Sequence, residues 1–352
     1  MKKKYNYADK VRNLCCKTFA CLSLFSIPFA HLSAQTFPAG FSQVKVATIY
    51  YPTSMAFAPD GRIFVTEKAG KVKIIKNGAV LPTPFLTVNV DQLNERGLSS
   101  IGIDPDFNNN HYVYVYYTVP GSTVHNRLSR FTANGDVAVA GSEVQILNFE
   151  TCINSIHNSG GMAFGPDGKL YIGVGNDNVN SNSQDLNNYM GKVLRINSDG
   201  SAPPGNPYSG SESAKRIWSY GLRNPWSLAI QPGTGKIFVN DVGEGAWEEI
   251  NNTTTVGKNF GWPGSEGMTT NPNYTAPVYT YPHGATGTND GCAITGGTFF
   301  NPTSSNYPAQ YTGKYFFIDY CNKWINYLDL STSPAQKSNF ATGLGGACNY
   351  IK

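Results

Sequence analysis

One histidine stands in a setting that suits acid–base chemistry. His157 lies in the segment Asn154–Gly161, which ends in a glycine pair directly before an apolar strand pattern. Paired glycines let a ligand or another backbone come close, and a neutral imidazole can take a proton from a hydroxyl near neutral pH. His157 is therefore a candidate general base, and the alternative is a loop histidine that caps the strand. His111 and His125 stand in polar loops, where solvated side chains are expected.

A second candidate pair is Arg223 and Asn224, which precede Pro225 and another apolar strand pattern. A guanidinium group can hold a carboxylate through two parallel hydrogen bonds. The pair could therefore bind a ligand that carries carboxylates. A surface arginine paired with a nearby acid is the competing interpretation.

Carboxylates and glycines are concentrated in residues 240–251, which include Asp241, Gly243, Glu244 and Glu249. Carboxylates and glycine-exposed carbonyls are the oxygen ligands that Ca²⁺ prefers. The spacing differs from that of an EF-hand loop, so a solvated acidic turn is the alternative to a metal site. Phosphate-binding glycine motifs, zinc-type histidine spacing and the Gly-x-Ser-x-Gly motif are absent from the sequence.

The elements that must position these residues are predicted to be strands. With 13% aromatic and only 14% charged residues, the composition argues against coiled coils and helical bundles. A recurring phrase, an apolar strand, a Pro-Asp-Gly-like turn and a second apolar strand, predicts β-hairpins. The four turns are centred near Pro59, Pro105, Pro166 and Pro232.

The spacing of the turns favours a propeller. The intervals of 46, 61 and 66 residues are roughly the length of a four-stranded blade of about 40–50 residues with loop insertions. A β-sandwich with coincidental turns is the alternative. Asn/Ser/Gly-rich stretches at Asn176–Asn188 and Ser198–Ser213 are expected to be loops on the binding face. No turn phrase follows residues 345–352, so we expect an incomplete last blade.

The N-terminal segment, residues 1–34, resembles a secretory signal peptide. It has a basic start, an apolar run from Phe19 to Ala30 and a small-residue exit before Gln35. A buried N-terminal helix is the alternative. The apolar run is too short to span a bilayer, so we expect a secreted or periplasmic domain, residues 35–352, with no membrane span. Without its six basic residues and one acidic residue, the net charge falls from +4 to −1, which disfavours a nucleic-acid partner.

Four cysteines remain after this segment. They are Cys152, Cys292, Cys321 and Cys348. An even set in an exported protein is typical of disulfides, and four cysteines allow three pairings among which the sequence does not choose.

Taken together in their order, eight motifs resemble the soluble PQQ-dependent glucose/sorbosone (aldose sugar) dehydrogenase family. The motifs are Glu95-Arg96-Gly97-Leu98, Ile103-Asp104-Pro105-Asp106-Phe107, His157-x-x-Gly160-Gly161, Phe164 to Tyr171, Met190 to Asn197, Gly221 to Trp226, Glu248 to Asn251, and Asn259 to Pro263. The resemblance implies an all-β, six-bladed β-propeller that oxidises aldoses with pyrroloquinoline quinone (PQQ) and Ca²⁺. The expected partners are an aldose substrate and an electron acceptor of unknown identity.

The resemblance also implies a role for each candidate residue. His157 would be the general base, and Glu95, Arg223 and Asn224 would face the cofactor. The list of implied metal ligands comprises the backbone carbonyls of Gly243 and Glu244 for the cofactor's Ca²⁺, and Glu249 for a second, structural Ca²⁺.

Three positions depart from the family pattern. Asn301 stands where a lysine is expected, Trp324 stands where a basic residue is expected, and Ile156 replaces an acid before the base. These departures would leave the cofactor's charge less fully neutralised and the imidazole differently oriented. Two other functions therefore stay open: a non-catalytic propeller that binds glycans or proteins, and a Ca²⁺-dependent sugar-lactone hydrolase.

Overall fold

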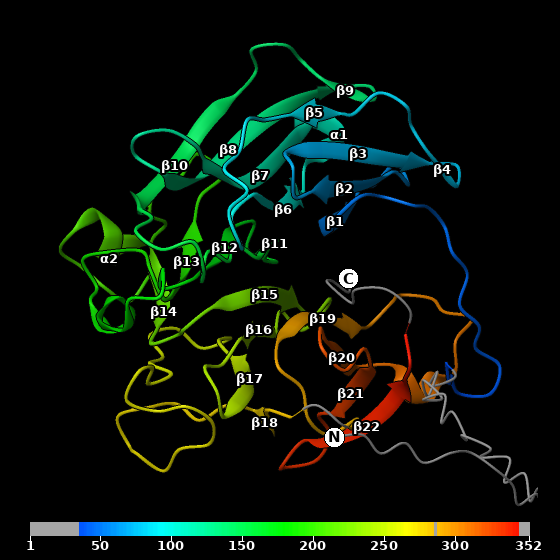
Figure 1. Ribbon diagram of the computed structural model, residues 1–352, viewed down its shortest axis with the longest axis vertical. Helices are drawn as coiled ribbons and strands as arrows, with labels where there is room; N and C mark the ends of the chain where they lie inside the picture. Colours follow the sequence, from blue (N-terminus) through cyan, green and yellow to red (C-terminus); the bar gives the residue numbers. More distant parts are fainter. Residues whose placement is uncertain (1–34, 285–286, 345–352) are drawn as a thin grey trace, which may run out of the picture. The chain divides into compact units, whose positions relative to one another are not determined.

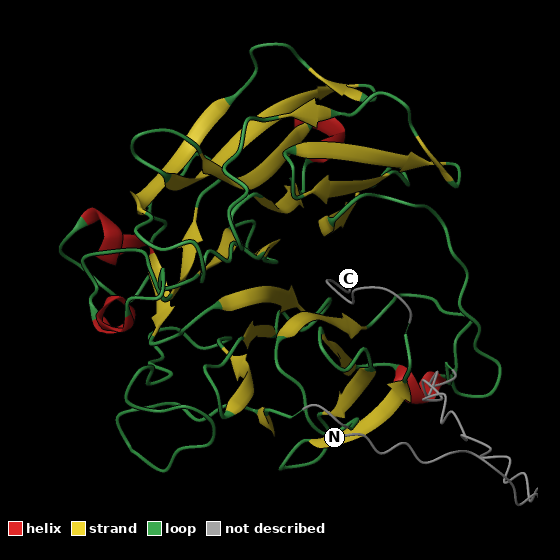
Figure 2. Cartoon of the chain, in the orientation of Figure 1, coloured by secondary structure: helices red, strands yellow, loops and turns green. Residues whose placement is uncertain are grey.

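The computed structural model of the protein describes residues 35–284 and 287–344, which lie in the structural unit Ser33–Lys352. Strands dominate, and helical turns are short (Figure 2). The helical turns are α1 (Phe107–Asn110), α2 (Glu212–Arg216), η1 (Asn180–Gln184) and η2 (Ala309–Tyr311). No helix of the described residues is long and apolar enough to cross a membrane. The expected signal peptide and Cys348 lie outside the described residues.

The strands form five antiparallel sheets. The first contains β1 (Pro52–Phe57), β2 (Ile63–Glu67), β3 (Lys71–Lys76), β4 (Ala79–Val80) and β5 (Leu86–Thr87). The second contains β6 (Leu98–Ile103), β7 (Tyr112–Val119), β8 (His125–Asn134), β9 (Val137–Ala138) and β10 (Val144–Thr151). The third contains β11 (Met162–Phe164), β12 (Leu170–Val174), β13 (Lys192–Ile196) and β14 (Ile217–Tyr220). The fourth contains β15 (Pro225–Ile230), β16 (Ile237–Asp241), β17 (Trp247–Asn252) and β18 (Tyr279–Pro282). The fifth contains β19 (Ile294–Phe300), β20 (Lys314–Asp319), β21 (Ile325–Asp329) and β22 (Gln336–Ala341).

The sheets are arranged as propeller blades. The first strand of each sheet contacts the first strand of the next, from β1 through β6, β11 and β15 to β19 (Figure 1). Buried apolar clusters fill the space between neighbouring sheets: Phe64 packs with Phe131 between the first two, and Phe238 packs with Tyr315 between the last two. The main expectation of a β-propeller is confirmed, and the sandwich alternative is wrong.

The expected number of blades is wrong. The described residues form five sheets rather than six, and the fifth has four strands, so the last blade is not incomplete. Residues 37–51, which precede β1, form no strand. Instead, Thr36 forms an antiparallel bridge with Thr342, and Phe41 stacks on Tyr307 in the β19–β20 connection and packs edge-on against Phe340 of β22. Residues 36–41 therefore contact the last sheet and its connections, and residues 37–51 add no further strand.

The four predicted hairpins are confirmed, and they explain where a site can form. Each Pro-containing turn joins the first and second strands of a sheet, as at Pro59, where Gly61 has a φ of +85°. All these turns lie at the finishing ends of the innermost strands. The starting ends of the same strands, and the segments that lead into them, therefore meet at the other end of the central channel.

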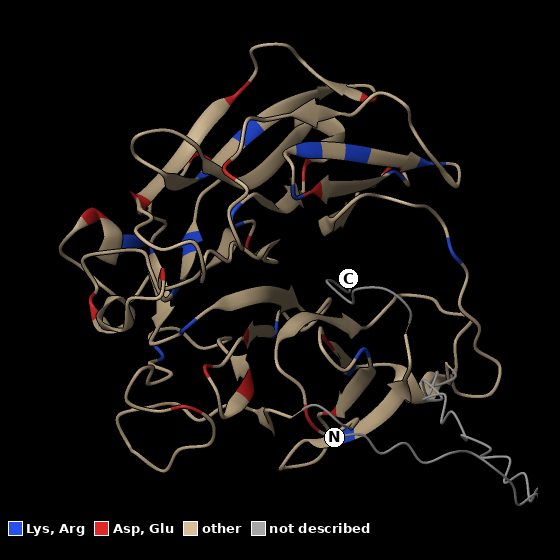
Figure 3. Cartoon of the chain, in the orientation of Figure 1, with Lys and Arg blue, Asp and Glu red and all other residues tan. Residues whose placement is uncertain are grey.

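Charge alone does not mark a site on this framework. Acidic and basic positions are interspersed over the sheets, and most of each ribbon is uncharged (Figure 3). The convergence of strand ends is therefore the better guide to function.

Candidate active site at one end of the central channel

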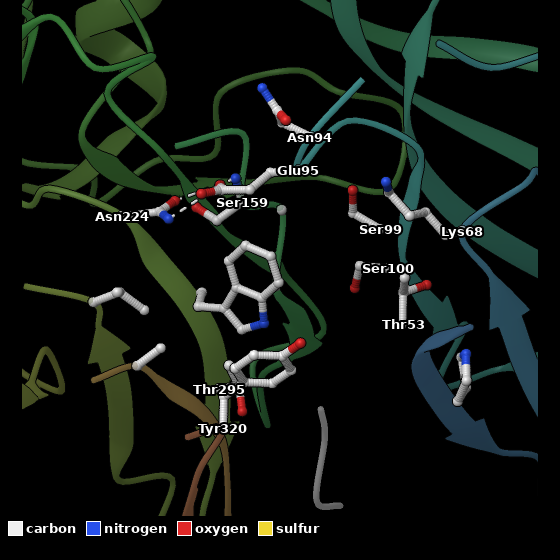
Figure 4. A pocket seen from close by; sticks show the side chains of 16 residues that line it. Thr53, Lys68, Asn94, Glu95, Ser99, Ser100, Ser159, Asn224, Thr295 and Tyr320 are labelled. Atoms are coloured by element: carbon white, nitrogen blue, oxygen red, sulfur yellow. Dashed lines mark hydrogen bonds between the residues drawn. The ribbon is translucent and has the colours of Figure 1, made fainter. Parts of the chain in front are cut away.

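A cavity of about 320 Å³ lies where the innermost strands start. Its wall is built from the beginnings of β1, β6, β15 and β19 and from the segment before β11. The lining residues are Pro52, Thr53, Lys68, Asn94, Glu95, Ser99, Ser100, Ser159, Gly160, Gly161, Asn224, Trp226, Val242, Ala293, Thr295 and Tyr320. Figure 4 shows their side chains pointing into one shared space. Its volume is at the lower end of the usual range for small-molecule sites.

Glu95 and Asn224, two of the predicted site residues, meet in this wall. Glu95 Oε2 accepts hydrogen bonds from the Asn158 backbone N–H (3.2 Å) and from Asn224 Nδ2 (3.3 Å). Asn224 Oδ1 in turn accepts from the Ser159 backbone N–H (3.4 Å). Burial raises the pKa of Glu95, although these hydrogen bonds oppose the rise. The carboxyl group is thus held in place beside the segment that carries His157.

Arg96, which sequence reasoning did not single out, positions that segment. Its Nη2 donates to the backbone carbonyls of Cys152 (3.2 Å) and Asn154 (2.8 Å), and its Nη1 pairs with Asp91 (3.3 Å). The side chain is buried. The segment before β11 is therefore anchored to the same loop that presents Glu95.

The orientation of the His157 ring is determined by Asn176. His157 Nδ1 lies 2.7 Å from Asn176 Oδ1, and the same oxygen accepts the backbone N–H of Asn178 (2.9 Å). Because this N–H needs an acceptor, the Asn176 atom facing the ring is its oxygen, so Nδ1 carries the proton. Nε2 then keeps its lone pair. Asn176 therefore does the orienting that Ile156 cannot.

His157 is buried, with 4% of its surface exposed. Burial, followed by the positive charge of Arg223, lowers its pKa to about 4. The imidazole is therefore neutral at physiological pH. His157 does not itself line the 320 Å³ cavity; its neighbours Asn158 and Ser159 connect it to Glu95 and Asn224.

Arg223 faces the acidic loop rather than the cavity. Its Nη1 donates to the backbone carbonyls of Val242 (3.1 Å) and Gly243 (2.6 Å), and its guanidinium lies 5.5 Å from the centre of the Trp262 ring. Within the described residues it forms no ion pair through its side chain, so the surface-pair interpretation is wrong. Its Nε is buried without a hydrogen-bond partner.

The loop expected to bind Ca²⁺ is held from one side by Glu266. Glu266 Oε1 accepts the backbone N–H groups of the four successive residues from Glu244 (2.7 Å) to Trp247 (3.3 Å). Successive N–H groups that converge in this way form an anion-binding nest. Burial opposes ionisation, yet these four donors lower the pKa of Glu266. The Glu244 side chain is exposed, so any metal contact from this residue would come from its carbonyl.

Glu249, the third predicted metal residue, lies apart from that loop. It faces Asp241 across the β16–β17 pair and accepts hydrogen bonds from the Gly267 N–H (2.6 Å) and from Asn251 Nδ2 (2.9 Å). Burial raises the pKa of Glu249 to about 8 and that of Asp241 to about 7. A cation would relieve two such buried acids, but the structure does not bring Glu249 together with Gly243 and Glu244 as one set of side-chain ligands.

Two positions where a basic residue was expected lie away from the cavity. Asn301 follows the finishing end of β19 and donates to the Pro232 carbonyl (2.7 Å). Trp324 is buried against Tyr281 and Phe317 in the core. Neither residue lines the cavity, so neither decides how its charge is balanced.

One disulfide is present in the described residues. It joins Cys292 to Cys321 at the edge of the cavity wall formed by Ala293 and Tyr320. The buried Cys152 thiol is free. The only cluster of potential metal-ligating side chains found in the described residues is this cysteine pair with Asp319, and the disulfide accounts for it.

The sequence profile of the Glucose / Sorbosone dehydrogenase family matches residues 49–321. The chain belongs to this family. The match covers all five innermost strands and every predicted site residue.

Named relatives share this match. Quinoprotein glucose dehydrogenase B of Acinetobacter calcoaceticus is 29% identical over 74% of this chain and 60% of its own length. Aldose sugar dehydrogenase YliI of Escherichia coli is 28% identical over 68% and 67%. The PQQ-bound aldose sugar dehydrogenase from Streptomyces coelicolor superposes with a TM-score of 0.71 at 26% identity, over 87% of this chain and 85% of that one. The chain therefore spans less than two thirds of the Acinetobacter protein.

A relative with a different kind of name is also similar. The Hedgehog-interacting protein of Homo sapiens is 25% identical over 56% of this chain and 33% of its own length. Membership of the glucose/sorbosone dehydrogenase family therefore does not by itself determine the activity, which depends on the residues of the site.

Proposed function

We propose that this chain is an exported oxidoreductase that oxidises the anomeric carbon of aldose sugars with PQQ and Ca²⁺. The observation that supports it most is the His157 imidazole, which is neutral, buried and oriented by Asn176 so that Nε2 keeps a lone pair. Named dehydrogenases within the family support the same reaction class.

In this proposal His157 Nε2 removes the proton of the anomeric hydroxyl. The hydrogen bond from Nδ1 to Asn176 Oδ1 stabilises the imidazolium that results. Glu95 and Asn224 lie beside this base and can hydrogen-bond sugar hydroxyls from the cavity wall. When bound, PQQ would supply the quinone that accepts the hydride from C1.

The donor groups around the cavity suit such a cofactor. The hydroxyls of Ser100 and Ser159 are buried in the cavity wall with no hydrogen-bond partner among the described residues, and so is Nε of Arg223 behind it. Buried donors without partners are costly unless a ligand satisfies them. Asn224 and Ser159 would hold the cofactor, and Arg223 would offset its negative charge.

The carbonyls of Gly243 and Glu244 would hold Ca²⁺ in this proposal. The Glu244 carbonyl accepts no hydrogen bond from a described residue, whereas the Gly243 carbonyl accepts one from Arg223. Oxygen ligands of this kind suit a hard cation. Glu249 would serve a second, structural Ca²⁺ beside Asp241.

The test is reconstitution. Purified protein is titrated with PQQ in the presence of Ca²⁺ and followed by absorbance, and dye reduction is then measured with a panel of aldoses. A stoichiometric PQQ complex that reduces dye with an aldose is the expected result. Absence of both would contradict the proposal.

A binding propeller is the second candidate, favoured by the likeness to the Hedgehog-interacting protein and by the position of His157 behind the cavity wall. Glycan or protein binding without dye reduction would identify it. The lactone-hydrolase alternative needs several acidic metal ligands at the channel, and the cavity wall described above contains one carboxylate, Glu95. Export, to the periplasm or outside the cell, is tested by finding whether the secreted protein begins near Gln35.

A further inference from the structure

The two sides of the cavity carry groups of opposite charge. In Figure 4, Glu95, Ser159 and Asn224 lie on one side, and Lys68, Ser99 and Thr53 lie on the other. Among the lining residues, Glu95 is the one carboxylate and Lys68 is the one cation. A ligand that fills the space would meet both.

The Lys68 backbone is fixed by hydrogen bonds, and the base of its side chain packs against Gly97. Its backbone N–H donates to the Tyr51 carbonyl (2.9 Å), and its own carbonyl accepts the Leu98 N–H (3.0 Å). Gly97, which has a φ of +149°, packs against its stem: a Cβ at Gly97 would lie 2.8 Å from Lys68 Cγ and 2.6 Å from the Lys68 carbonyl oxygen. Glycine at position 97 therefore makes room for the lysine stem.

The ammonium group of Lys68 has no acidic partner in the part of the chain that the structure describes. Its Nζ donates to the Gln92 carbonyl (2.9 Å), and no ion pair among the described residues includes it. An ammonium group has three N–H donors, so this single hydrogen bond leaves two for a ligand. The unpartnered hydroxyl of Ser100, which is 2% exposed, adds a further polar group to the same cavity.

We propose that Lys68 forms a carboxylate-binding subsite, so that the cavity accepts a hydroxyl-bearing ligand that ends in a carboxylate. In a sugar this describes an acidic aldose such as a uronic acid, with its hydroxyls toward Glu95 and its carboxylate toward Lys68. Oxidation of such a sugar rests on the proposed function, whereas its binding at Lys68 does not. The same carboxylate chemistry could come from the cofactor, and the experiment separates the two sources.

The first measurement is equilibrium binding of glucuronate and of glucose to the protein without PQQ. Wild type is expected to bind glucuronate more tightly than glucose, and Lys68→Met is expected to weaken glucuronate binding about tenfold or more, as loss of a hydrogen bond to a charged group predicts. Lys68→Arg keeps the charge and should keep most of the preference. Lys71→Met removes an exposed lysine outside the cavity and is the matched control.

The second measurement is a PQQ titration of the same variants by absorbance. If Lys68→Met weakens PQQ binding and leaves glucuronate binding unaltered, the carboxylate belongs to the cofactor and the acidic-sugar assignment is overturned. If Lys68→Met, with an unchanged thermal melt, alters neither ligand, the subsite itself is overturned. Failure of the wild type to bind PQQ or reduce dye would contradict the proposed function and would leave the glucuronate result to decide this inference.

Discussion

The two mouths of the central channel are built by the same five strands and differ in chemistry. At the starting ends the lining includes Lys68, Glu95 and Asn224, whereas at the finishing ends a second cavity of about 320 Å³ is lined mainly by apolar side chains such as Met162 and Leu228. The connections account for the difference. Hairpin turns occupy the finishing ends, whereas the segments that link successive sheets bring polar residues such as Glu95 and Asn224 to the cavity at the starting ends.

The comparison teaches that position along a strand, rather than residue type, separates the proposed site from packing in this fold. At the finishing ends Asn301 donates a hydrogen bond to the Pro232 carbonyl in the turn of the neighbouring sheet. Residues just before β6, β11 and β15 converge on one cavity although they are far apart in the sequence. The following predictions test that division.

Replacement of His157 is expected to have the largest effect. His157→Gln should lower kcat/KM for aldose oxidation by roughly 10²–10⁴-fold, because a general base contributes about that much. PQQ and Ca²⁺ binding should change little, since other residues are proposed to hold them. His125→Gln, at the start of β8 and away from the cavity, is the control. If His157→Gln kept full activity in steady-state dye reduction, the cavity at the starting ends would not be the catalytic site.

At the opposite mouth we expect loss of stability without loss of chemistry. Leu228 is 4% exposed and packs between the third and fourth sheets. Leu228→Ala should lower the free energy of unfolding by about 2–5 kcal/mol through lost burial and a residual cavity, as measured by urea denaturation. Activity per folded molecule should stay near that of the wild type, and a large drop in kcat at low temperature would argue against the division between the two mouths.

The Glu266 nest gives an intermediate effect. Glu266→Ala removes the acceptor of four backbone N–H groups in the loop 244–247, so amide hydrogen exchange there should accelerate. If that loop binds Ca²⁺, its affinity should fall about 10–100-fold, as for other residues that orient ligands. Glu244→Gln is the comparison and should weaken binding only modestly, because its side chain is exposed. Complete loss of Ca²⁺ in Glu244→Gln would make that side chain the ligand.

The last prediction concerns pH. In the unfolded chain Glu249 has a pKa of about 4.3. In the folded protein burial, followed by the charge of Asp241, raises its pKa to about 8. The folded state therefore binds more protons between these values, and its stability should fall as pH rises from about 5 to 8. In a chelator, Glu249→Gln should flatten this decline in thermal melts. An unchanged slope would show that other groups control it.

Much of the framework could be predicted from the sequence because its signals are local. The Pro-Asp-Gly sequence at Pro59 and at Pro166 predicts a turn from adjacent residues alone, and the looser phrases at Pro105 and Pro232 do so through their prolines. The hairpin of the fifth sheet was not predicted, because residues 301–313 join β19 to β20 through a longer connection that contains η2 and lacks the Pro-Asp-Gly-like phrase. The number of blades depends on pairing between sheets, which no local pattern encodes.

The site residues that lie in family motifs could be predicted from the sequence. His157, Glu95 and Asn224 were placed near one another by resemblance, and the structure brings their segments together. Asn176, Glu266 and Lys68 were not singled out, because each acts on a partner 19 or more residues away through contacts that exist only in the folded chain. An asparagine in an Asn-rich loop carries no sign of which histidine it will orient.

The bridge between Thr36 and Thr342 joins positions 306 residues apart. During synthesis Thr36 waits for its partner until all the strands of the five described sheets have been made, because Thr342 follows β22. Contacts of such long range slow folding and leave strand edges uncovered in the meantime. The two ends of the described chain therefore cannot join until the fifth sheet has been made.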